Sequence, residues 1–136
     1  MPRKTDSGNP SDWLFFARAD LDAVAVLCKQ RVSFVVCRSK LAEALEKTLK
    51  ADLISRGWFL RKIHDLQALR EDLETRDAAS GQELRNVADE LAESYTESRY
   101  PGFDLDEDDW PSLEQLLAEV EKYLDEVEAG LNKQGK

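Results

Sequence analysis

The chain has a single histidine, His64, and an imidazole is the side chain best suited to moving protons near neutral pH. A single histidine excludes two-histidine metal sites and catalysis by a cysteine with a second histidine. His64 therefore has two interpretations. It is a ligand-contacting group, or it is a residue at the start of a helix that packs beside Trp58 or Phe59.

Three lysines recur at helical spacing in the first half of the chain. Lys40, Lys47 and Lys50 are separated by seven and three positions, so they share one face of a helix. Their ammonium groups are candidates for binding phosphate. The same face also suits ion pairing, because Glu43 precedes Lys47 by four positions and Glu46 precedes Lys50 by four.

A second group of candidates precedes Pro101. Tyr95 and Arg99 are one helical turn apart, and a guanidinium can hold a phosphate or a carboxylate through two parallel hydrogen bonds. The structural alternative is that Arg99 anchors the acidic loop at 103–109. The predicted ligand-binding residues are Lys47, Lys50, His64, Tyr95 and Arg99, and no catalytic residue is predicted.

Neither a metal site nor a cofactor site is predicted. The acidic loop at 103–109 lacks the spacing and the glycine of an EF-hand, and no glycine-rich phosphate loop is present. Cys28 and Cys37 form no metal-binding motif and lie among apolar residues. We expect both to be buried free thiols of a protein in the reducing cytoplasm.

Charge is distributed unevenly around a net value of −9. Residues 1–64 hold 12 basic and 7 acidic side chains, whereas residues 65–136 hold 7 basic and 21 acidic ones. The overall acidity disfavours non-specific binding to duplex nucleic acid, while the first half retains room for a basic surface. No apolar run approaches the ~20 residues of a membrane span, so no membrane association is predicted.

The segment from Ser33 to Arg56 is the helix that positions most of these candidates. Apolar residues repeat along it at the spacing of one buried face, and Gly57 follows as a natural C-terminal cap. The first helix opens at Asn9-Pro10 and has two apolar stripes, Leu14 to Cys28 and Phe15 to Leu27. A helix this apolar is either central or joined to a partner chain.

Further periodic segments complete an all-α fold, an up-and-down bundle of four main helices plus one short helix. The short helix runs from about Asp65 to Thr75, and Ala78-Ala79-Ser80-Gly81 is predicted to be a linker that leads to a Ser80/Glu83 capping box. A helix then runs to Tyr100-Pro101, and the last one starts at Pro111, or at Ser112 with Gln115 as a capping box. The predicted domain organisation is a disordered tail at 1–10, the bundle at 11–131 and a frayed tail at 132–136.

Several short motifs, in their order along the chain, resemble the HEPN family (higher eukaryotes and prokaryotes nucleotide-binding domain). They cover the chain from Trp13 to about Val127. They are Trp13-Leu14-x-x-Ala17-x-x-Asp20-Leu21-x-Ala23, Glu46-Lys47-Thr48-Leu49-Lys50-Ala51, His64-Asp65-Leu66 with Leu69, and Arg99-Tyr100-Pro101. The resemblance implies the same helical bundle.

Many HEPN proteins are ribonucleases whose motif is an arginine, four to six residues, then a histidine. Here Arg61 leaves only two residues before His64, and Arg56 leaves seven. In those enzymes the motif lies later in the bundle, where this chain has Arg99 and no following histidine. The family also often has a histidine at the position of Lys40 and a glutamine at that of Glu43. These departures lead us to expect a protein without ribonuclease activity.

The predicted function is therefore a non-catalytic binding and assembly module of a prokaryotic cell. The resemblance implies a minimal nucleotidyltransferase as protein partner, a nucleotide or RNA as ligand, a toxin–antitoxin-like role and a homodimer. The second apolar stripe of the first helix independently favours the homodimer. Two alternatives stay open: a metal-independent ribonuclease with a divergent motif, and a purely structural dimer.

Overall fold

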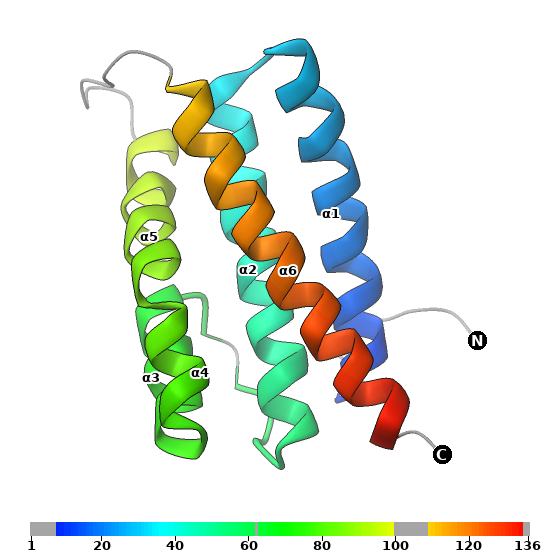
Figure 1. Ribbon diagram of the computed structural model, residues 1–136. Helices are drawn as coiled ribbons and strands as arrows, with labels where there is room; N and C mark the ends of the chain where they lie inside the picture. The colour runs from blue at the N-terminus through cyan, green and yellow to red at the C-terminus, as the bar shows by residue number, and fades with distance from the viewer. Residues whose placement is uncertain (1–7, 62, 100–108, 135–136) are drawn as a thin grey trace.

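A computed structural model describes residues 8–61, 63–99 and 109–134, and over these residues the protein has six α-helices and no strand. The four long helices run alternately up and down, which confirms the predicted all-α bundle (Figure 1). Within the described ranges, no helix has the length and apolarity needed to cross a bilayer. The helices are α1 Pro10–Gln30, α2 Phe34–Ser55, α3 Leu66–Arg76, α4 Ala78–Glu83, α5 Arg85–Arg99 and α6 Trp110–Gln134.

Helix α2 is the centre of the bundle, as its apolar periodicity predicts. It packs against α1, α3, α5 and α6. Its core side chains Leu41, Leu45 and Leu49 are completely inaccessible to water. The charged side chains of α2 are therefore held on a backbone that is fixed on several sides.

The start of α1 and the end of α2 follow local sequence rules. The side chain of Asn9 accepts a hydrogen bond from the Ser11 amide at 3.0 Å and caps α1, with Pro10 in the first helical position. Helix α1 ends at Gln30, and the capping residue Arg31 takes a left-handed conformation with φ of 54°. Gly57, at φ of 93°, follows α2 as predicted, because glycine adopts this conformation without strain.

The predicted linker at 78–81 is wrong, because these residues form most of α4. Asp77 caps this helix in place of the predicted Ser80 capping box, and its side chain accepts hydrogen bonds from Ser80 N at 3.2 Å and Ser80 Oγ at 2.9 Å. Gly81 is buried against the backbone of Glu74 in α3, where a Cβ atom would collide. The glycine is thus a site of close helix approach, which local propensity cannot reveal.

The start of α6 also differs from the prediction. The helix begins at Trp110, so Pro111 occupies its second position. Asp109 caps it, with its side chain accepting from Ser112 N at 3.1 Å and its carbonyl from Leu113 N at 3.1 Å. An aspartate immediately before the helix therefore does the work expected of Ser112.

Candidate functional site

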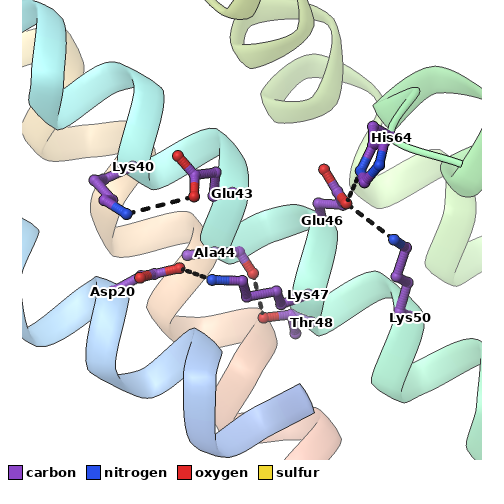
Figure 2. A network of polar contacts seen from close by, with 9 residues as sticks. All are labelled: Asp20, Lys40, Glu43, Ala44, Glu46, Lys47, Thr48, Lys50 and His64. Atoms are coloured by element: carbon purple, nitrogen blue, oxygen red, sulfur yellow. Dashed lines mark hydrogen bonds and ion pairs between the residues drawn. The ribbon is translucent and has the colours of Figure 1, made fainter. Parts of the chain in front are cut away.

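Glu46 is the centre of a polar cluster that joins α2 to the connection before α3. Its Oε2 atom lies 3.0 Å from Lys50 Nζ and 2.8 Å from His64 Nδ1, as Figure 2 shows. The exposed fractions of the side chains are 3% for Lys50, 10% for Glu46 and 67% for His64. The cluster therefore runs from a buried cation to a solvent-facing imidazole.

The ammonium of Lys50 is stabilised on two sides. Besides its ion pair with Glu46, its Nζ atom lies 5.0 Å from the centroid of the Trp13 ring in α1. A buried charge requires such partners, because removing it from water is costly. The predicted Glu46–Lys50 pair is confirmed, but it is a buried pair and not part of a solvated face.

Lys47 makes a different pair from the predicted one. Its Nζ atom lies 2.6 Å from Asp20 Oδ2 on α1, so the bond connects two helices, while Glu43 pairs with Lys40 at 3.4 Å (Figure 2). The predicted Glu43–Lys47 pair is therefore wrong. An aspartate on the packed neighbour α1 is a closer partner for Lys47 than the glutamate one turn away on its own helix.

Every lysine of α2 is thus neutralised by a carboxylate of the same chain. Lys40, Lys47 and Lys50 each have a carboxylate oxygen within 3.4 Å. A phosphate group that approached this face would have to displace those carboxylates. The solvent-facing group of the cluster is the imidazole of His64.

The other two predicted ligand-binding residues lie on α5. The backbones of Tyr95 and Arg99 are helical, but their side chains lie outside the described part of the structure. The acidic loop at 103–108 also lies outside it. The structure therefore joins Lys50 and His64 through Glu46 and places Lys47 in a separate ion pair with Asp20. The positions of the Tyr95 and Arg99 side chains stay untested.

The two cysteines are buried free thiols, as predicted. Burial raises the pKa of Cys28 to about 11 and also raises the pKa of Cys37. A thiol with a raised pKa is a poor nucleophile at neutral pH, since the thiolate is the reactive form. Within residues 8–61, 63–99 and 109–134, no three His, Cys, Asp or Glu side chains are grouped so as to hold a metal ion.

A second polar network was missed by sequence reasoning. Asp52 of α2 accepts hydrogen bonds from Tyr123 Oη at 2.6 Å and from Arg56 Nε at 2.8 Å, and Arg56 also donates to Asp77 at 3.2 Å. Burial raises the pKa of Tyr123 well above its ordinary value, and Asp52 raises it further. The network ties α2, α6 and the α3–α4 corner together.

Two signals pointed to this network. Asp52 precedes Arg56 by four positions, which is the spacing of a helical ion pair. Tyr123 interrupts an otherwise aliphatic face of the last helix, and a buried tyrosine hydroxyl usually has a hydrogen-bond partner.

The comparisons with known proteins agree with this architecture. The family model for the HEPN domain matches residues 10–130, which is most of the chain. No curated protein and no solved structure gives a match. With the helical bundle and the extent of this match together, the chain belongs to the HEPN domain family.

Proposed function

We propose that this HEPN domain is non-catalytic and acts in the cytoplasm as a binding and assembly module. Its protein partner is a minimal nucleotidyltransferase, in a toxin–antitoxin-like pair, and the module itself is a homodimer. The observation that carries the proposal is the environment of His64. Its Nδ1 atom lies 2.8 Å from Glu46 Oε2, and no arginine stands before it with four to six residues between them.

The last two arginines before His64 in the sequence are engaged elsewhere. Arg56 is bound to Asp52 and Asp77, and the closest carboxylate to Arg61 is that of Asp72, at 3.9 Å. Cleavage of RNA by an arginine–histidine pair needs both groups at one phosphate. Because both arginines are held in ion pairs away from His64, we propose a role for His64 in ligand binding and not in RNA cleavage.

The ligand-binding roles of Lys47, Lys50, His64, Tyr95 and Arg99 remain part of this proposal. In the cluster of Glu46, Lys50 and His64, the exposed side chain of His64 is the one that a ligand can reach. Lys50 is buried and acts through its ion pair with Glu46. A nucleotide titration of wild type against His64→Ala tests the contact directly. Equal affinities would remove the imidazole from the site.

Assembly is supported by apolar surface on the α1–α2 hairpin. Among the described residues, five large hydrophobic side chains are exposed, and four of them lie on this hairpin: Phe15, Val26, Val32 and Val36. Large exposed apolar side chains gathered on one hairpin favour an interface, and closed two-fold pairing is the commonest arrangement of identical chains. Light scattering across a concentration series should therefore give a dimer mass at moderate salt, and a monomer mass throughout would refute assembly.

The lack of catalysis is tested by incubating purified protein with RNA in the presence of a chelator. We expect no cleavage by wild type, by His64→Ala or by Arg61→Ala, because the two side chains do not form a catalytic pair. Cleavage that disappears in either variant would establish the ribonuclease alternative.

The protein partner is tested by searching the neighbouring genes for a minimal nucleotidyltransferase and co-expressing it with this chain. Co-purification through a tag on the nucleotidyltransferase, retained in His64→Ala, is the expected result. Failure of the two proteins to associate at micromolar concentrations would overturn this part of the proposal.

A further inference from the structure

One face of α1 points away from the bundle and carries large apolar side chains at its two ends. Phe15 is 52% exposed and Val26 is 63% exposed, with exposed alanines at 19 and 23 between them. These positions recur at three and four, so they share one helical face, opposite the buried Ala17 and Val24. Figure 1 shows α1 at the outer edge of the bundle, with α2 and α6 beside it.

The order of large and small side chains along this face of α1 is nearly the same in either direction. A large side chain, two alanines and another large side chain follow one another in Phe15, Ala19, Ala23 and Val26. We propose that two copies of the chain pair through this face with their α1 helices antiparallel and crossing between Ala19 and Ala23. The inference rests on the homodimer of the proposed function and specifies its interface.

Antiparallel pairing matches large residues with their counterparts. Positions equally far from the crossing point meet, so Phe15 packs against the partner's Val26, and Val26 against the partner's Phe15. Small residues at the crossing allow close approach, since helix separation depends on the side chains at the contact. Val32 and Val36, which are also exposed, extend the apolar surface at the turn of the hairpin.

Charge at the edge of this face fits antiparallel pairing. Arg18 and Asp22 are one helical turn apart on the same edge, and in an antiparallel pair that edge lies beside the same edge of the partner. In the antiparallel pair Arg18 lies opposite the partner's Asp22. Arg18 already lies 2.7 Å from Asp125 and 3.5 Å from Glu128, so it is fixed on the α6 side of this face.

The shape of the surface beside Phe15 fits the same arrangement. A groove of about 410 Å³ runs between α1 and α6. Its apolar lining is Leu14, Phe15, Ala19 and Leu131, and its polar lining is Ser11, Arg18, Asp22, Glu128 and Asn132. With Phe15 opposite the partner's Val26, that valine reaches the edge of the groove. In this arrangement Val26 of each copy lies beside the groove next to Phe15 of the other copy.

The test is disulfide trapping with two variants that each add one cysteine, Phe15→Cys and Val26→Cys. These positions are eleven residues apart, so two copies of either one would lie about 16 Å apart along an antiparallel pair. A disulfide needs Cα atoms within ~7 Å. An equal mixture of the two variants should therefore cross-link several-fold more than either variant alone under mild oxidation. In the mixed dimer the second Phe15–Val26 contact stays intact.

A mixture of Phe15→Cys with Lys122→Cys is the matched control, because Lys122 is an exposed residue of α6 away from this face. The native Cys28 and Cys37 are buried and remain in place. Strong self-linking of Phe15→Cys or of Val26→Cys would establish parallel pairing and overturn the proposal.

Light scattering on the same samples tests dimer formation separately from the α1 interface. A dimer whose mixture links no better than the control uses another face, which overturns this interface and leaves the assembly proposal intact. A monomer mass for the wild type overturns both.

Discussion

Replacing Lys50 with methionine tests whether the centre of the candidate site is a buried ion pair. Methionine keeps most of the aliphatic volume and removes the ammonium. Glu46, whose side chain is only 10% exposed, then retains His64 as its partner at 2.8 Å. The Trp13 ring keeps an apolar neighbour but loses the cation above its face.

The expected cost follows from burial. Removing one member of a buried pair typically destabilises a protein by about 3–5 kcal/mol, because the remaining charge is left uncompensated. The His64 contact holds the effect near the lower end, at about 3 kcal/mol. For a domain of this size the melting temperature should fall by roughly 10 °C. The matched control is Lys40→Met, whose side chain is 44% exposed and whose pair with Glu43 should contribute less than about 1 kcal/mol.

The assay is urea unfolding followed by circular dichroism, with all variants at one protein concentration so that association contributes equally. Adding Glu46→Met to Lys50→Met should recover most of the loss, since an apolar pair replaces the unbalanced charge. A loss below ~1 kcal/mol for Lys50→Met, equal to that of the control, would show that water reaches the pair. In that case Lys50 could contact a ligand directly, without the ligand first displacing the Glu46 carboxylate.

Three further predictions concern the contacts that hold the bundle. Gly81→Ala should destabilise by about 1–3 kcal/mol in urea unfolding, since its Cβ would collide with the backbone of Glu74. Gly130→Ala, with open space around the glycine, should be neutral or stabilising in the same measurement. The pKa of Tyr123 is raised in the folded state, so the stability it contributes is present below its unfolded pKa of about 10 and is lost as pH rises through the folded pKa. Tyr123→Phe should therefore flatten the alkaline limb of a plot of unfolding free energy against pH, and an unchanged limb would contradict this. Hydrogen bonds from Ser80 lower the pKa of Asp77, so its contribution is present above the unfolded value of about 3.9 and is lost as pH falls through the folded value; Asp77→Asn, which preserves the helix cap, should reduce that acid dependence in denaturant titrations.

Local patterns in the sequence determine much of this fold. The apolar repeat of α2 predicts its central position, and Asn9 and Gly57 predict the helix ends that the structure shows. These features depend on residues within one or two turns of each other. They need no knowledge of how the helices pack.

The features that sequence reasoning missed depend on contacts between distant segments. Lys47 has a suitable glutamate on its own helix, but packing places Asp20 of α1 closer. Tyr123 and Asp52 are 71 positions apart, so no spacing rule connects them. Gly81 has the local appearance of a linker, and only the approach of Glu74 explains why a glycine is needed inside a helix there.

The central position of α2 also has a consequence for the order of events during synthesis. Helix α1 precedes α2 directly, so the hairpin can form as soon as both have left the ribosome, since it depends on contacts close in sequence. Helix α6, which also covers α2, ends 79 residues after Ser55. At translation rates of about 5–20 residues per second, part of the α2 surface stays uncovered for roughly 4–16 s, until α6 has been synthesised. During that interval the α1–α2 hairpin is an unfinished core attached to the ribosome, and chaperones and neighbouring nascent chains compete for the same apolar side chains that α6 later buries.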